Sequence, residues 1–76
     1  MSKLPQVKPK FLSKFFEKQG FTITRQVGSH QRLVHNDGRK ISIAIHNKPI
    51  APGTFKSILR QANMDKEEFL KVFRKR

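Results

Sequence analysis

Large hydrophobic residues recur at helical spacing near the start of the chain. Phenylalanine and leucine occupy positions 11, 12, 15 and 16, and polar residues fill the positions around them. This spacing predicts an amphipathic helix that begins at Pro9, where proline suits the first turn, and ends at Gly20, which can adopt the left-handed conformation of a helix cap. A chain this short needs its large side chains to close a core, so we interpret the aromatic stripe as packing and not as a surface for stacking nucleobases.

Three runs with a period of two follow this helix. Residues 21–27 alternate, with phenylalanine, isoleucine and valine on one side and threonine and glutamine on the other, which predicts a half-buried strand. In the next run, residues 30–35, Leu33 is the clearest inward residue. Residues 41–46 alternate cleanly, with isoleucine at positions 41, 43 and 45, and predict a third strand.

The loop Asn36-Asp37-Gly38 joins the last two strands, and its length decides their register. A two-residue turn at Asp37-Gly38 would pair Leu33, a core residue, with the polar Ser42. A three-residue loop with Gly38 in the left-handed bulge position pairs Leu33 with Ile41 and keeps both faces of the sheet uniform. This register also pairs His30 with Ala44 and Arg32 with Ser42, and it is expected to collect on one open face Thr22, Thr24, Gln26, His30, Arg32, Ser42 and His46.

Two more helices are expected after the sheet. Pro52 and Gly53 begin a helix whose apolar residues, at positions 55, 58, 59 and 62, fall on one face, and Asn63 is expected to end it in the left-handed conformation. Asp65 then has the character of an N-cap, with Glu68 three positions on to complete a capping box for a short C-terminal helix. The order is helix, three antiparallel strands, helix, short helix, an α+β fold with both main helices on one side of the sheet.

The composition limits the roles that this fold can take. The 76 residues suit one domain, with residues 1–8 as an irregular lead-in. Lys and Arg number 17 against 5 Asp and Glu, and the formal charge of +12 favours a polyanion, most commonly nucleic acid. No predicted helix has a spare apolar face for a membrane surface. The absence of cysteine, of a signal-peptide pattern and of a long apolar stretch predicts a soluble cytoplasmic protein.

The placement of acidic residues and histidines argues against metal-dependent chemistry. The carboxylates are divided among the first helix, the hairpin loop and the last helix, so no cluster of the kind that two-metal nucleases use is expected. Strand phase places His35 on the side of the sheet opposite His30 and His46, which leaves zinc with too few ligands. We therefore expect no metal and no other cofactor.

Cleavage of RNA without a metal needs fewer groups, and the open face offers them. The 2′-OH of the substrate is itself the nucleophile, so the protein has to move protons and stabilise the charge of the phosphorane. His30 is the candidate catalytic residue, because an imidazole serves as base or acid at neutral pH. His46 lies on the same face and is a candidate second proton-transfer group, the alternative being an ordinary exposed loop histidine.

Candidate residues for binding RNA or phosphate accompany these histidines. Arg32, Lys48 and Lys56 carry the positive charge that a phosphate requires. Ser29 is expected to hydrogen-bond the turn or a phosphate and not to act as a nucleophile, because no acidic residue is placed to orient a Ser-His pair. Gly53 has two interpretations: it lets a phosphate approach the helix N-terminus, or it eases the loop into the helix.

Several short motifs follow one another along the chain: Gly20-Phe21, Gly28-Ser29-His30, Asp37-Gly38-Arg39, His46, Pro52-Gly53-Thr54, Ile58-Leu59-Arg60-Gln61-Ala62 and Glu68-Phe69-Leu70. Each is weak alone, but in this order and at this spacing they resemble the HicA-type toxins, the small ribonucleases of bacterial toxin-antitoxin pairs. The resemblance runs from about Val7 to Phe73. The chain departs from the family pattern at Gln31, often aromatic or histidine, at Ala44, often proline, and at Asn63, usually glycine.

This resemblance implies a fold similar to a double-stranded-RNA-binding domain and cleavage of mRNA without a metal, with His30 at the catalytic position. It also implies a HicB-type antitoxin that binds this protein and blocks its site. A non-catalytic RNA-binding module of the same fold is the competing interpretation. The strong positive charge further predicts salt-sensitive binding, with a log-log slope of about −3.5 on single strands for about five phosphate contacts.

Overall fold

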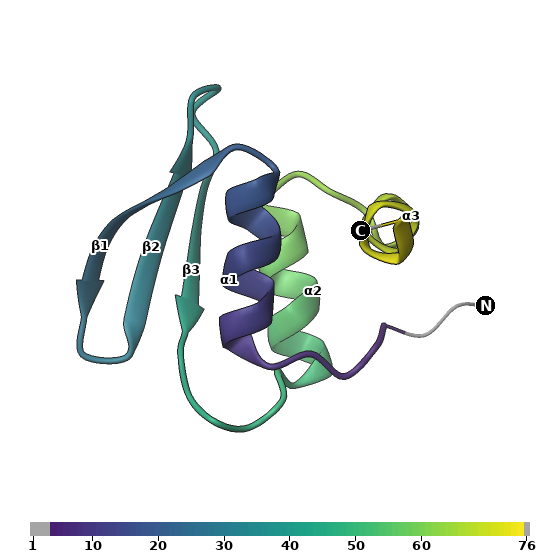
Figure 1. Cartoon of the computed structure of the whole chain (residues 1–76), viewed down its shortest axis with the longest axis horizontal. Helices are drawn as coiled ribbons and strands as arrows, with labels where there is room; N and C mark the ends of the chain where they lie inside the picture. Colours follow the sequence, from purple (N-terminus) through teal and green to yellow (C-terminus); the bar gives the residue numbers. More distant parts are fainter. Residues whose placement is uncertain (1–3, 76) are drawn as a thin grey trace.

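The computed structural model describes residues 4–75, so the first three residues of the expected lead-in, and Arg76 at the end of the basic C-terminal run, lie outside the described residues. The elements follow in the order helix, three strands, helix, helix. Figure 1 shows α1 and α2 together on one face of the sheet, with α3 on the side of these helices away from the strands. This is the predicted α+β fold, and no helix among the described residues covers the other face of the sheet.

Helix α1 (Pro9–Lys18) forms where the hydrophobic spacing predicted it. Its first residue is proline, whose missing N–H has no helical partner to lose. After the helix, Gly20 has a φ of +98°, in the left-handed region. A Cβ on Gly20 would lie 2.8 Å from Nε2 of His35, so both the backbone conformation and the available space require glycine. The buried residues of the aromatic stripe are Leu12, Phe15 and Phe16.

The three strands form one antiparallel sheet in the order β1-β2-β3. Their bounds are Phe21–Val27 for β1, His30–His35 for β2 and Lys40–Ala44 for β3. The predicted register of β2 and β3 is confirmed, with Leu33 opposite Ile41, His30 opposite Ala44 and Arg32 opposite Ser42. The loop between these strands contains Gly38 at a φ of +98°, as the three-residue loop required.

Strand β1 contains a β-bulge that its alternating pattern did not predict. Ile23 pairs with Leu33, and the next pair is Arg25 with Arg32, so Thr24 is the extra residue. An extra residue shifts the pleat by one position, and every side chain after it changes face.

The predicted assignment of faces is therefore wrong for the second half of β1. Gln26, expected on the open face, lies opposite Gln31 on the side of the helices. Val27, expected on the inward side, lies opposite His30 and is 59% exposed. The bulge also brings Arg25 to the open face, because its partner Arg32 is there.

Helices α2 (Pro52–Gln61) and α3 (Lys66–Lys75) follow the predicted caps. Asn63 has a φ of +53° and ends the turn after α2 in the left-handed region. The capping box of α3 is confirmed, since the backbone N of Glu68 donates to Oδ1 of Asp65 at 2.8 Å and the backbone N of Asp65 donates to Oε1 of Glu68 at 3.3 Å. Helix α3 was expected to be short, but at 10 residues it is as long as α1 and α2.

Aromatic rings from all three helices meet in the core. The ring of Phe69 in α3 lies 4.8 Å from that of Phe15 in α1 and 5.2 Å from that of Phe55 in α2. Phe11, the first residue of the predicted stripe, is 60% exposed and is not part of the core. Among the residues described, no helix combines the length and apolar character that crossing a bilayer demands.

Candidate functional site

The turn between β1 and β2 holds His30 at one end of the sheet. Val27 pairs with His30, so Gly28 and Ser29 form a two-residue hairpin loop. Gly28 has a φ of +60°, as the first central residue of a type II′ turn requires. A Cβ on Gly28 would meet nothing within 4 Å, so the backbone conformation alone calls for glycine. The carbonyl oxygen of Ser29 accepts a hydrogen bond of 2.6 Å from the backbone N of Ile45, which ties the turn to the end of β3.

A chain of hydrogen bonds fixes this turn to α1. The hydroxyl of Ser13, which is buried on α1, donates to Oε1 of Gln31. Nε2 of Gln31 donates to Oε1 of Gln26 at 3.1 Å, and Nε2 of Gln26 donates to the carbonyl oxygen of Gly28 at 3.2 Å. These contacts lie on the side of the helices, whereas the next side chain along β2, His30, points to the other face. The position of His30 is therefore set from behind by polar contacts that leave its own face open.

On the open face, the residues paired with His30 on the neighbouring strands are small or apolar. The residues paired two positions further along β2 are cationic. Its strand partners are Val27 and Ala44. Two residues further along β2, Arg32 lies opposite Arg25 of β1. Same-face neighbours along a strand are about 7 Å apart, so two exposed arginines lie one row from the exposed His30. An imidazole with two cations in the next row of the same exposed face is suited to binding a phosphodiester.

Arg25 is a candidate site residue that the sequence analysis missed. The signal was present in the chain, because strict alternation from Phe21 through Ile23 places Arg25 on the inward side. Burying an unpaired guanidinium is costly, so a charged residue in phase with the core indicates a bulge before it. Lys40, opposite Val34 in the register of β2 and β3, adds a further cation to the same face of the sheet.

His46 and Lys48 lie in the loop that follows β3. His46 comes two residues after Ala44, the strand partner of His30, so both histidines are at the same end of the sheet. The backbone N of Lys48 donates to Nδ1 of His46 at 3.3 Å, which orients the ring. Both side chains are exposed.

The remaining predicted residues, Gly53 and Lys56, belong to α2. The N-cap of this helix, Ala51, makes no side-chain hydrogen bond, so the first-turn N–H groups have no side-chain acceptor there. A Cβ on Gly53 would meet nothing within 4 Å, so packing does not require glycine. Lys56 lines a cavity between α2 and α3. The structure therefore brings Ser29, His30 and Arg32 together at the sheet. Lys56 lies apart from them, in the cavity between α2 and α3.

The Asp37-Gly38-Arg39 motif stabilises the fold at the other end of the sheet. Nε of Arg39 donates to Oδ2 of Asp37 at 2.8 Å, and Nη1 donates to the carbonyl oxygen of Ala62 at 2.6 Å. The backbone N–H of Arg39, followed by its guanidinium, lowers the pKa of the Asp37 carboxyl below its ordinary value. His35 packs against Phe21 with ring centroids 5.1 Å apart, which confirms its predicted position on the inward side.

The geometry defines the class of protein to which the chain belongs. It is a small, strongly basic α+β domain with an exposed histidine and arginines on an uncovered sheet face. Within residues 4–75, no three His, Asp or Glu side chains converge where they could hold a metal ion. Such a surface is typical of domains that bind nucleic acid through its phosphates.

Comparison with known protein families gives a more specific assignment. Residues 10–64, more than half of the chain, match the family described as HicA toxin of bacterial toxin-antitoxin. The chain belongs to this family, so it is the toxin of a toxin-antitoxin pair and has an antitoxin as its partner. No curated protein matches the chain. The matched residues include the whole sheet, α2 and most of α1, whereas α3 begins after them.

Proposed function

We propose that this toxin is a metal-independent endoribonuclease that cleaves mRNA, with His30 as its catalytic residue. The observation that carries the proposal is the exposure of His30 on a hydrogen-bonded turn beside Arg25 and Arg32. A general base has to be reachable by the substrate and held in position, and a phosphorane needs fixed cations close to it. The charge of +12 draws RNA to the surface before any specific contact forms.

In the proposed reaction, the imidazole of His30 takes the proton from a ribose 2′-OH, and O2′ attacks the adjacent phosphorus. Arg25 and Arg32 stabilise the negative charge that develops on the non-bridging oxygens. The bond between phosphorus and the 5′ oxygen breaks, and the leaving oxygen takes a proton from Nε2 of His46. His46 does this in its imidazolium form, in which Nδ1 is also protonated and no longer accepts the hydrogen bond from the backbone N of Lys48. The products are a 2′,3′-cyclic phosphate and a 5′-hydroxyl, so neither water nor a metal ion enters the bond-breaking step.

Three further residues are proposed to bind phosphates on either side of the cleaved bond. The hydroxyl of Ser29 precedes His30 in the turn, where it is exposed and able to donate to a phosphate oxygen. Lys48 supplies a cation in the loop after β3. The backbone N–H of Gly53, in the first turn of α2, supplies a donor that the N-cap side chain does not use.

The decisive variant is His30→Ala, assayed on mRNA in the presence of a chelator. The exposed histidine carries little of the packing, so the variant is expected to retain the fold and most of its RNA affinity. Cleavage is expected to fall by roughly 10²- to 10⁴-fold, the share of acid-base catalysis in such reactions. His35→Ala is the matched control, because His35 lies on the opposite face of the sheet, and its cleavage per folded molecule should match the wild type.

The same assay separates an enzyme from a binding module. If His30→Ala and the wild type degrade RNA equally, or if neither degrades it while both bind it, the nuclease assignment is wrong and the protein is a non-catalytic RNA-binding module.

We also propose that the antitoxin is of the HicB type and that it blocks the open face of the sheet. A face that carries Arg25, Arg32 and Lys40 attracts an acidic protein surface as well as RNA. An excess of 2′-O-methyl RNA, which lacks the nucleophile, should then slow formation of the toxin-antitoxin complex. Equal rates with and without this RNA would show that the antitoxin binds elsewhere. Since its substrate is mRNA, the toxin is proposed to act in the cytoplasm.

A further inference from the structure

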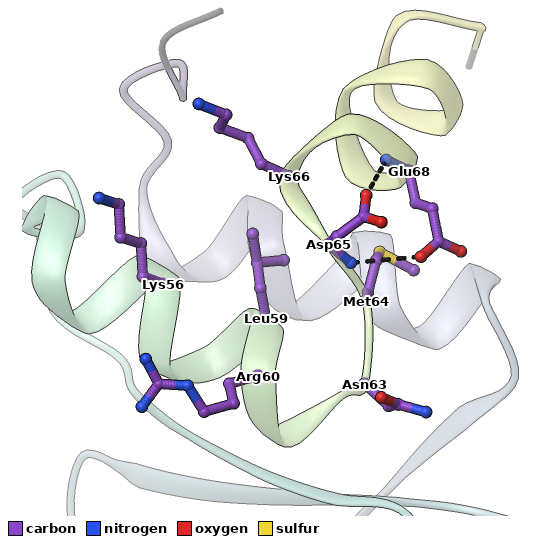
Figure 2. Close-up of a pocket in the computed structure, with 8 residues that line it drawn as sticks. All are labelled: Lys56, Leu59, Arg60, Asn63, Met64, Asp65, Lys66 and Glu68. Carbon is purple, nitrogen blue, oxygen red and sulfur yellow. Dashed lines mark hydrogen bonds between the residues drawn. The ribbon is translucent and has the colours of Figure 1, made fainter.

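A second cationic surface lies between α2 and α3, away from the sheet. A cavity of about 460 Å³ opens there, and Figure 2 shows the residues that line it. Lys56 and Arg60 reach it from α2, and Lys66 reaches it from α3. Leu59 and Met64 supply the apolar part of its wall. We call this cavity the α2–α3 groove.

The groove carries three cations and two carboxylates, so positive charge is in excess there. Of its two acidic residues, Asp65 accepts a hydrogen bond from the backbone N of Glu68, and Glu68 accepts one from the backbone N of Asp65. Both carboxylates are thus turned to the N-terminus of α3, whose dipole they balance. Among residues 4–75 the ion pairs are those that Asp37 makes with His35 and Arg39, so none of the three cations of the groove has an acidic partner there.

We propose that the α2–α3 groove binds a nucleotide of the substrate RNA that lies several positions from the cleaved bond. This inference rests on the proposed function, since it assumes that RNA is the substrate. The phosphate is held by Arg60, Lys56 and Lys66, of which Arg60 offers a planar fork of donors. The base packs on Leu59 and Met64, and the exposed Asn63 amide offers a donor and an acceptor to its edge.

The shape of the groove favours a nucleotide over an acidic peptide segment. The groove is shallow and open to solvent, and its volume of about 460 Å³ has room for one nucleotide lying on the surface. An amphipathic helix requires a row of apolar anchor sites along its length, and this groove offers the side chains of Leu59 and Met64 alone for that purpose. The three cations and two carboxylates give the groove a formal charge of +1, and this excess beside a small apolar wall matches a phosphate joined to a base.

The groove and His30 lie on opposite sides of the helical layer. Figure 1 shows α1 and α2 between the sheet and α3, and a helix with its side chains is about 10 Å wide, packed about 10 Å from the sheet. The two sites are therefore separated by at least about 20 Å. The longest dimension of the molecule is 35 Å, which a strand of about ten nucleotides spans even when it is stacked at about 3.4 Å per nucleotide. A long RNA reaches both sites, whereas an RNA of four nucleotides occupies only one.

The test uses the full chain and compares two double variants that remove equal charge. Arg60→Ala with Lys66→Ala changes the groove, and Lys14→Ala with Lys18→Ala on α1 is the matched control, because these lysines do not line the groove. Each protein is measured for binding a 16-nucleotide 2′-O-methyl RNA at several salt concentrations. Each is also measured for cleavage of a 4-nucleotide RNA, which needs only the site at His30.

For the groove variant, the log-log slope of affinity against salt should become shallower by about 0.7, since the one phosphate contact that the groove makes on a single strand is lost. The control should keep the wild-type slope, and all three proteins should cleave the 4-nucleotide RNA equally. Unchanged RNA binding in the groove variant, or an equal loss of binding in both variants, would show that the groove does not bind RNA. Neither result would contradict the proposed nuclease function. If the groove variant instead lost antitoxin binding while its RNA binding stayed unchanged, the groove would be a protein docking surface, and the RNA proposal would be wrong. A wild type that binds the long RNA but does not cleave the 4-nucleotide RNA would refute the proposed function instead.

Discussion

Replacing Ser13 with alanine tests whether the turn that carries His30 is held from α1. Ser13 is 5% exposed, and its hydroxyl donates to Oε1 of Gln31, a partly buried side chain. Without that hydroxyl, Oε1 of Gln31 has no donor. An unsatisfied acceptor costs about 1–3 kcal/mol when it is fully buried, and Gln31 is only partly buried, so the cost here lies toward the lower end. The gain in helix propensity from serine to alanine, about 0.5 kcal/mol, offsets part of this. We expect a net loss of about 0.5–1.5 kcal/mol in the free energy of unfolding.

A double-mutant cycle with Gln31→Leu isolates the contact from these other effects. Each single variant and the double variant are unfolded in urea, with circular dichroism as the signal. The coupling free energy between positions 13 and 31 should be about 0.5–1.5 kcal/mol, the net value of a hydrogen bond of this kind. A coupling close to zero would show that the two side chains act independently and that the network does not support the turn.

The same variant gives a second readout through activity. Ser13 lies behind the sheet and cannot touch RNA bound at His30, but its loss frees Gln31 and Gln26 from the arrangement that holds the carbonyl of Gly28. We therefore expect Ser13→Ala to lower kcat at a temperature where the protein is still fully folded, with KM little changed. Unaltered kcat under these conditions would mean that the turn keeps its geometry without the network.

Three other variants follow from single observations. Gly20→Ala should destabilise the protein by at least about 1–2 kcal/mol in urea unfolding, because the left-handed backbone is strained for alanine and its Cβ would lie 2.8 Å from Nε2 of His35; a change below 0.5 kcal/mol would contradict this. The pKa of Asp37 is lowered in the folded state, so the charged carboxylate stabilises the fold. This stabilisation is fully present above the unfolded pKa of about 3.9 and is lost as pH falls through the lower folded pKa. The stability difference between wild type and Asp37→Asn should therefore shrink as pH falls below about 4. A difference that stays constant down to pH 2 would show that Arg39 does not favour the charged carboxylate. Arg25→Ala should reduce cleavage about 10-fold or more while leaving stability nearly unchanged, because Arg25 is exposed on the face of His30; cleavage equal to wild type would remove it from the site.

The parts of the fold that could be predicted from sequence are those where side-chain phase and backbone chemistry agree. Leu33 and Ile41 had to share a buried face, and Gly38 had to adopt a positive φ, so together they fixed the register that the structure shows. Asn63 could be predicted as a left-handed residue because its short polar side chain tolerates that conformation.

The errors arise where tertiary contacts override a local pattern. In β1 the alternation was followed through Thr24, whereas the chain inserts a bulge that places Arg25 on the open face and Gln26 on the helix-facing side, where it remains exposed. There Gln26 finds a partner in Gln31. Strand phase predicts Gln31 on the helix-facing side, but it does not predict this hydrogen bond. The position of Lys56 likewise depends on how α3 packs beside α2, which its own helix does not encode.

The chemistry of the RNA ends tests the central claim most directly. Purified toxin is incubated with mRNA in excess chelator, and the new ends are identified by mass spectrometry. Because O2′ is proposed to attack the phosphorus next to it after His30 removes its proton, every cut should leave a 2′,3′-cyclic phosphate and a 5′-hydroxyl. Fragments with 3′-hydroxyl and 5′-phosphate ends, or cleavage that stops when the chelator is added, would contradict the account.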